Sequence, residues 1–145
     1  EHYAPVTETG FCTNDKWGFT LGASPDGLVG KDGAIECKSR IQKYQVQTGG
    51  EHYRDGVTTE DYTLQVQTLL LVTERKWCDL ISYSGGLPMA VMQIGPNPEI
   101  QEAIVDACAK FEARINEAIA DYTQAVKAMP RVIETERRIE EEMIV

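Results

Sequence analysis

Two acidic residues and a lysine stand in the sequence at a spacing that suits metal-assisted hydrolysis of a phosphodiester. Asp26 lies in the turn-like segment 24–27, S-P-D-G, and Glu36 and Lys38 fall in the segment 34–38, A-I-E-C-K, which predicts a strand. Because alternate side chains of a strand point to the same face, Glu36 and Lys38 can address one point in space. If the chain folds Asp26 back beside Glu36, two carboxylates and an ammonium group converge there.

Such a set of groups suits a hard divalent cation and a charged phosphate. Mg²⁺ prefers oxygen ligands, which two carboxylates, a main-chain carbonyl and water provide. A bound cation polarises the phosphate and lowers the pKa of bound water. Lys38 could orient that water, act as its base, or keep its charge and stabilise the transition state. The sequence leaves these roles open, and a Glu-x-Lys pair without the turn acid is most often an exposed ion pair.

The elements that must position these groups are expected to form a curled sheet, mixed and mainly antiparallel. Residues 6–12 and 17–21 predict a hairpin, because β-branched and aromatic residues flank a turn-like T-N-D. Residues 28–29 and 34–38 bracket a second tight turn, G-K-D-G. Further strands are predicted at residues 77–83 and 89–94.

Helices are expected to flank this sheet. Residues 40–48 are a polar candidate, which the following Gly-Gly should end, so that residues 49–57 form a loop. Thr58 or Thr59 is expected to cap a helix that runs to about Thr73. One face of that helix is predicted to be core, and it consists of Tyr62, Val66, Leu69, Leu70 and Thr73.

A long C-terminal helix is predicted from Pro98, because apolar residues recur at helical spacing on one stripe that must cover something apolar. The stripe consists of Ile100, Ile104, Cys108, Phe111, Ile115, Ile119, Tyr122 and Val126. Residues 130–145 are strongly charged and predict a helical tail, either solvated or in contact with a subunit or partner. Together the elements predict an α+β fold with one domain over residues 1–129.

The composition argues against several kinds of site. The four cysteines are widely spaced and the histidines number two, so a zinc ribbon, an iron–sulfur site or a His-rich metal site is not expected. No apolar run approaches the roughly 18 residues of a membrane span. The net charge of −9 is unusual for a protein that binds nucleic acid. Contact with DNA would therefore need a local basic rim and a bound divalent metal.

The motifs resemble those of a known nuclease superfamily. The segments S-P-D-G-L and I-E-C-K are similar to the signature of the PD-(D/E)XK nucleases. Q-V-Q at 65–67, W-C-D at 77–79 and S-Y at 82–83 are similar to its phage lambda exonuclease-like (YqaJ-like viral recombinase) branch. The resemblance covers residues 10–88 and implies an α/β/α restriction-endonuclease-like core, so that residues 1–129 would be a single nuclease core domain.

The resemblance implies a role for each motif residue. The implied catalytic residues are Asp26, Glu36, Lys38 and Gln65. The implied metal ligands are Asp26, Glu36 and the main-chain carbonyl of Cys37. Gln65 would help to position the attacking water, and Ser24 matches a position that holds a terminal phosphate of the substrate. For Gln67, an ordinary exposed glutamine is the favoured interpretation.

Members of this family carry a further acid on a helix that precedes the first strand. Asp26 stands too close to the start of this sequence to be preceded by that acid. The expectation is therefore that the N-terminal helical part of the nuclease core is missing from residues 1–129, and the alternative is that Glu1 or Glu8 takes the place of that acid.

The resemblance further implies a Mg²⁺-dependent exonuclease, with Mn²⁺ as a substitute, that digests linear double-stranded DNA from 5′ to 3′ for phage-type homologous recombination. The implied partners are double-stranded DNA ends, a single-strand annealing protein and further copies of the chain in a trimeric or tetrameric ring, with no membrane. The expected setting is the cytoplasm of a bacterial host cell, with a phage or prophage origin. The alternatives are an endonuclease of the same superfamily and a non-catalytic DNA-binding or assembly module.

Overall fold

The structure, a computed structural model, describes residues 3–56 and 60–136. The chain divides into two compact units, residues 1–109 and 110–145, and the boundary falls within the last helix, α3 (Pro98–Ala128). Every other helix and strand that the described residues form belongs to the first unit.

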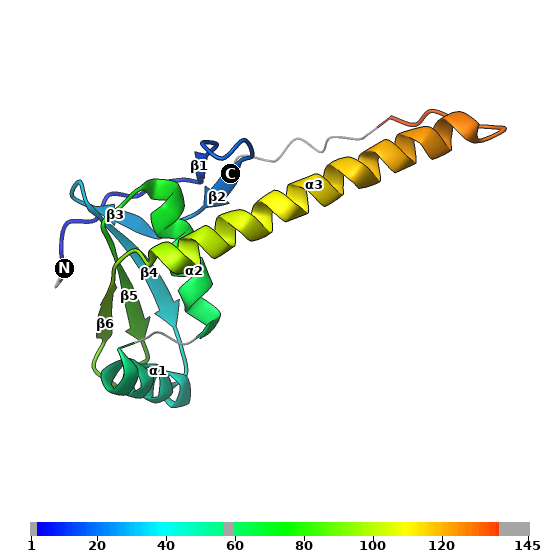
Figure 1. Cartoon of the computed structure of the whole chain (residues 1–145). Helices are drawn as coiled ribbons and strands as arrows, with labels where there is room; N and C mark the ends of the chain where they lie inside the picture. The colour runs from blue at the N-terminus through cyan, green and yellow to red at the C-terminus, as the bar shows by residue number, and fades with distance from the viewer. Residues whose placement is uncertain (1–2, 57–59, 137–145) are drawn as a thin grey trace. The chain divides into compact units, whose positions relative to one another are not determined.

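A four-stranded sheet forms the centre of the first unit (Figure 1). Its strands are, in spatial order, β3 (Gly27–Val29), β4 (Gly33–Ser39), β5 (Trp77–Tyr83) and β6 (Ala90–Ile94). β4 and β5 run parallel, whereas the two outer pairs are antiparallel. The expected mixed, mainly antiparallel sheet is therefore confirmed. Its parallel pair requires a long crossover connection, in which two helices lie.

A separate two-stranded hairpin precedes this sheet. Its strands are β1 (Cys12–Asn14) and β2 (Leu21–Ala23), which pair antiparallel. The strands predicted at residues 6–12 and 17–21 are therefore wrong in position, although a hairpin forms. The reason is a distant pairing, because Thr7 and Leu28 exchange two backbone hydrogen bonds of 2.9 Å. The β-branched residues before the hairpin thus lie along β3.

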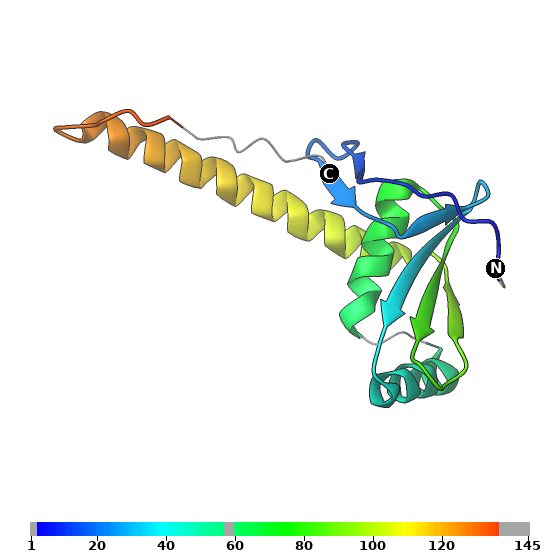
Figure 2. The same cartoon turned by 180° about the vertical axis from the view of Figure 1, so that it is seen from behind.

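The first crossover helix, α1 (Gln42–Asp55), runs through the two glycines that were expected to end it. The loop predicted for residues 49–57 is therefore wrong up to Asp55, and Val57 lies outside the described residues. The side chains of Gln42 and Gln45 donate hydrogen bonds to main-chain oxygens in the β5–β6 turn. These anchors hold the helix against the cost of about 1 kcal/mol that a glycine adds to a helix interior. Figure 2 shows α1 beyond the end of the sheet at which β4 and β5 finish.

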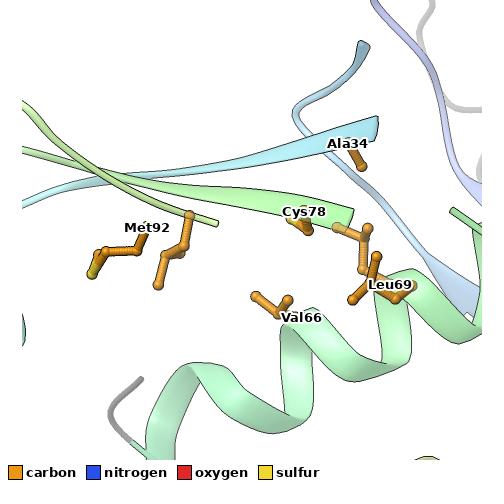
Figure 3. Close-up of a cluster of buried hydrophobic side chains, with 7 residues drawn as sticks. Ala34, Val66, Leu69, Cys78 and Met92 are labelled. Atoms are coloured by element: carbon orange, nitrogen blue, oxygen red, sulfur yellow. The ribbon is translucent and has the colours of Figure 1, made fainter. Parts of the chain in front are cut away.

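The second crossover helix, α2 (Glu60–Thr73), packs on the sheet and closes the core. It ends at Thr73 as predicted, and the predicted caps Thr58 and Thr59 lie outside the described residues. Figure 3 shows Val66 and Leu69 of this helix facing residues of the sheet. The buried cluster consists of Ala34, Val66, Leu69, Leu70, Cys78, Leu80 and Met92.

The long helix α3 begins at Pro98 as predicted, and the side-chain oxygen of Asn97 accepts a hydrogen bond from the backbone N–H of Ile100. Within the described residues, however, none of its side chains is buried. Phe111, Ile119 and Tyr122 of the predicted stripe are 60%, 58% and 69% exposed. Ile100, Ile104 and Cys108 of the stripe are half-buried and line a pocket together with Leu64 and Thr68 of α2. The expectation that the stripe covers an apolar surface is therefore met in part by residues 100–108 and is not met by Phe111, Ile119 and Tyr122.

Residues 129–136 form no helix, unlike the helical tail predicted from residue 130, and residues 137–145 lie outside the described part. The nuclease domain expected over residues 1–129 stays a prediction. Among the described helices, none is both long and apolar enough to cross a membrane.

Candidate active site

Glu36 and Lys38 project from β4 on the face that packs against α2, together with the core residue Ala34. β4 is buried up to Glu36, which is 4% exposed, and it opens to solvent from Cys37 onward. The Lys38 ammonium nitrogen lies 2.6 Å from Oε1 of Glu36. The strand therefore places this ion pair at the margin of the core, towards the carboxyl ends of two parallel strands, where such sheets commonly bind ligands.

Gln65 of α2 joins Glu36 and Lys38 in a hydrogen-bonded triad. Its amide nitrogen donates to Oε1 of Glu36 over 2.7 Å, and its amide oxygen accepts a hydrogen bond from the Lys38 ammonium over 2.9 Å. The next residue, Val66, is fully buried in the core and fixes the rotation of α2, so that Gln65 stands at the edge of the helix beside β4. The structure thus brings together three residues that the sequence singled out.

Asp26 is held against β4 by two contacts that flank Glu36. Its backbone N–H donates to the carbonyl of Ile35 over 3.1 Å, and its carboxylate accepts a hydrogen bond from the backbone N–H of Cys37 over 2.6 Å. The antiparallel pairing of β3 with β4, which the turn at residues 30–32 joins, thus continues to Asp26 and brings its carboxylate to the strand that carries Glu36.

The second oxygen of the Glu36 carboxylate, Oε2, is buried and has no hydrogen-bond partner among the described residues. A buried charged oxygen without a partner is costly, and a cation would relieve that cost. Two carboxylates, from Asp26 and Glu36, and the neighbouring carbonyl of Cys37 form a donor set that fits a hard divalent cation. No cluster of three or more His, Cys, Asp or Glu side chains is found among the described residues, so main-chain oxygen and water would complete the coordination.

Burial and nearby negative charge raise the pKa of two thiols near this site. Burial, followed by the charges of Asp26 and Glu36, raises the pKa of the Cys37 thiol, and Lys38 opposes the rise. Burial, and next to it the charge of Glu36, raises the pKa of Cys78 to about 12. The surroundings of Glu36 are therefore electrostatically favourable for a cation.

The triad lies between two pockets. One, of about 410 Å³, is lined by Glu36 and Gln65 together with Ser24, Phe11 and residues of β2 and α2. The other pocket, of about 460 Å³, has Lys38 in its wall. Its lining is Cys37, Lys38, Ser39, Arg40, Ile41, Tyr44 and Tyr62. A larger cavity of about 720 Å³, around Gln67 and Asn97, contains none of the predicted site residues.

Ser24 is therefore brought to the same pocket as Glu36 and Gln65, and its contact with a substrate phosphate stays a prediction. Gln67, in contrast, is buried and turned away from the site. Its amide nitrogen donates to the carbonyl of Gly95 over 2.9 Å, and its amide oxygen accepts a hydrogen bond from the backbone N–H of Asn97 over 2.8 Å. The expectation of an ordinary exposed glutamine at position 67 is therefore wrong, because Gln67 is buried by its contacts with the chain before α3.

The sequence interpretation missed the second pocket. Tyr62 was expected only as a core residue of α2, but the Lys38 ammonium lies 5.2 Å and the Arg40 guanidinium 4.4 Å from the centre of its ring. The available signal was the basic residue Arg40 two positions after Lys38. That signal is weak, because only the packing of α2 shows which ring the two cations share.

Comparisons with known proteins identify related chains. The pattern of the YqaJ-like viral recombinase domain matches residues 2–76 of the 145 in this chain. The alkaline exonuclease LHK-Exo from Laribacter hongkongensis is 32% identical, with a TM-score of 0.66, over 83% of this chain and 64% of that chain. The structure of LHK-Exo in complex with dAMP is 31% identical, with a TM-score of 0.64 and the same shares covered. None of the curated proteins matches.

A third solved structure, that of SSO0001, is 15% identical, with a TM-score of 0.52, and covers 76% of this chain and 50% of that chain. This likeness concerns the fold alone. This chain spans 64% of the length of LHK-Exo.

The likeness to LHK-Exo confirms the expected fold class, a mixed sheet with flanking helices and a long C-terminal helix. The family match extends over more than half of the chain and contains Asp26, Glu36, Lys38 and Gln65. It confirms the resemblance that the motifs indicated and supports the interpretation of the chain as a nuclease. The chain belongs to the family of the YqaJ-like viral recombinase domain.

Proposed function

We propose that this chain is the catalytic core of a metal-dependent DNA exonuclease. The observation that carries the proposal is the buried Oε2 of Glu36, which lacks a partner among the described residues while Lys38 and Gln65 occupy the other carboxylate oxygen. Membership of the viral recombinase family and the likeness to an alkaline exonuclease support it.

The proposed ligands of the cation are the carboxylates of Asp26 and Glu36 and the main-chain carbonyl of Cys37. Mg²⁺ is the proposed ion and Mn²⁺ its substitute, because both accept oxygen ligands in octahedral geometry. When bound, such an ion polarises the scissile phosphate and provides hydroxide near neutral pH.

Lys38 is proposed to act as a charged donor. An ammonium group has three N–H donors, and Oε1 of Glu36 and the amide oxygen of Gln65 accept two of them. The third donor is left for an oxygen of the substrate phosphate, where it stabilises the charge of the transition state. Gln65 forms hydrogen bonds with both Lys38 and Glu36. Its proposed role is to keep these two side chains in position and to orient the attacking water.

The pocket beside Ser24 is proposed to take the terminal nucleotide. LHK-Exo was solved in complex with dAMP, a nucleoside monophosphate, which is the size of an exonuclease product. The Ser24 hydroxyl would donate to the terminal phosphate, while Phe11 and Leu64 offer apolar surface to the base and sugar. Stacking of this kind accepts every base, as a nuclease without sequence preference requires.

The wider proposal concerns the whole protein. We propose that it digests linear double-stranded DNA from 5′ to 3′ and supplies single strands to an annealing protein during phage-type recombination in the cytoplasm of a bacterial host. A ring of three or four copies would retain DNA topologically, which reduces the need for broad positive charge in a chain of net charge −9.

Digestion of an end-labelled linear duplex with Mg²⁺ tests the proposal, with Lys38→Met compared with the wild-type chain. Loss of the third donor and of its charge is expected to lower the rate about 10²- to 10³-fold, with the fold retained by circular dichroism. The matched control is Lys31→Met, because Lys31 lies in the β3–β4 turn, at the far end of β4, and should leave the rate unchanged.

Equal rates for wild type and Lys38→Met would remove Lys38 from the mechanism. Cutting of covalently closed circular DNA would instead identify an endonuclease, since an exonuclease needs an end. If the wild-type chain cuts neither substrate in Mg²⁺ or Mn²⁺, the non-catalytic binding module becomes the better interpretation.

A further inference from the structure

Beside the triad lies a row of alternating cations and aromatic rings, formed by Arg40, Lys43, Tyr44 and Tyr62 and called the cation–aromatic row below. The Arg40 guanidinium lies 4.4 Å from the centre of the Tyr62 ring and 5.8 Å from that of Tyr44. The Lys43 ammonium lies 5.2 Å from the centre of the Tyr44 ring. At the other end of the row, the Lys38 ammonium lies 5.2 Å from the centre of the Tyr62 ring. The row therefore starts at the active-site lysine and leads away from it.

Three elements hold the row in place. Arg40 follows directly on β4, and its backbone N–H donates to the carbonyl of Tyr83 at the end of β5 over 2.8 Å. Lys43 and Tyr44 lie in the first turn of α1, and Tyr62 lies in the first turn of α2. The row is thus built from rigid elements at the same end of the sheet.

The charge of the row differs from that of the molecule. The chain has a net charge of −9, yet among the described residues no acidic side chain lines the pocket of about 460 Å³ that contains Lys38, Arg40, Tyr44 and Tyr62. Neither Arg40 nor Lys43 forms an ion pair with a residue that the structure describes. Their charges are therefore available to an anionic ligand.

The geometry selects the kind of anion. A guanidinium stacked on a ring keeps its N–H edge directed away from the ring, where it can bind the two oxygens of a phosphodiester at once. The aromatic rings add flat surfaces for the sugars and bases of a strand. A ligand that extends from Lys38 along this row must present repeated anionic groups, as the backbone of a nucleic acid does.

We propose that the cation–aromatic row binds the phosphate backbone of the DNA strand next to the bond that is cut, with Arg40 as the principal phosphate contact and Tyr62 as the residue that positions it. The inference deepens the proposed function, since it requires the strand to pass Lys38. The terminal nucleotide would lie on the Ser24 side of the triad and the continuing strand on the Arg40 side.

The test is the salt dependence of DNA binding without catalysis. Binding of a short fluorescein-labelled duplex is measured by anisotropy in EDTA over a series of salt concentrations. The slope of log K against log salt concentration is negative, and loss of one phosphate contact lowers its magnitude by about 0.9. Below, a lower slope means a slope of smaller magnitude. Arg40→Gln is expected to show this change and a roughly tenfold weaker affinity at low salt.

Three further variants separate contact from structure. Arg40→Lys keeps the charge and is expected to restore most of the wild-type slope, although it loses the bidentate contact and part of the affinity. Lys43→Gln changes an exposed residue on the surface of α1 and is expected to lower the slope without a change in melting temperature. Lys31→Gln, at the far end of β4, is the control and should match the wild-type slope.

Wild-type slopes in both Arg40→Gln and Lys43→Gln would overturn the inference, whatever happens to affinity or melting temperature. That outcome leaves the proposed function intact, because cleavage by the wild-type chain and its loss in Lys38→Met are measured separately. Conversely, a lowered slope in a chain that cuts no DNA would support the row as a DNA contact and contradict the exonuclease proposal.

Discussion

At the level of single residues, the two carboxylate oxygens of Glu36 have different contacts. Oε1 accepts hydrogen bonds from Lys38 and Gln65, whereas Oε2 has no partner among the described residues. A carboxylate arranged in this way can bind a cation with one oxygen and hold the catalytic side chains with the other. Gln65 matters because it contacts both groups.

Gln65→Ala tests this arrangement. Removal of the amide leaves Lys38 and Glu36 without a common partner, so the rate of cleavage at saturating DNA is expected to fall about 10²-fold while KM changes little. The control is Gln47→Ala, because Gln47 is exposed on α1 and bonds only to Glu51 among the described residues. Single-turnover rates on an end-labelled duplex make the comparison, and a wild-type rate in Gln65→Ala would contradict the role.

Most of the triad could be predicted from the sequence, and the cation–aromatic row could not. The spacing of Glu36 and Lys38 on a strand fixes their common face, and the tight turn G-K-D-G between β3 and β4 brings Asp26 back along that strand. The contact between Arg40 and Tyr62 joins two elements separated by α1, so it depends on how the crossover packs. Local periodicity carries no information about such a contact.

At the level of elements, the strand Trp77–Tyr83 was predicted correctly because aromatic and β-branched residues followed by a Ser-Gly-Gly turn are typical of a strand. The N-terminal hairpin and α1 were predicted incorrectly for a shared reason. Thr7 pairs with Leu28, and Gln45 bonds to the carbonyl of Pro88, so in both cases a distant contact outweighs the local preference. Only the three-dimensional structure shows these contacts.

Replacement of glycines in α1 tests how this helix is held. Gly49 lies inside the helix and a Cβ there would meet no atom within 4 Å, so Gly49→Ala is expected to raise the free energy of unfolding by about 0.5 to 1 kcal/mol. Gly56 ends the helix with a φ of 66°, and Gly56→Ala is expected to lower the free energy of unfolding by about 1 kcal/mol. Urea denaturation measures both, and destabilisation by Gly49→Ala would show that α1 does not run through that residue.

At the level of the whole molecule, a chain of net charge −9 that binds DNA as proposed must concentrate its favourable interactions with DNA at one place. The structure provides cations from Lys38 to Lys43 at the end of the sheet, beside a carboxylate pair that suits a divalent ion. Proposed retention in a ring would complement such a local contact, since topology does not depend on charge.

Thermal denaturation with increasing Mg²⁺ shows whether Asp26 and Glu36 together hold a divalent cation. An ion that binds only the folded chain stabilises it by about 2.7 kcal/mol when its free concentration is 100 times Kd. We expect the wild-type chain and the control Glu74→Gln, a surface acid bonded to Lys16, to show this shift. Asp26→Asn and Glu36→Gln should each lose it, whereas an undiminished Mg²⁺-dependent shift in both variants would contradict the account.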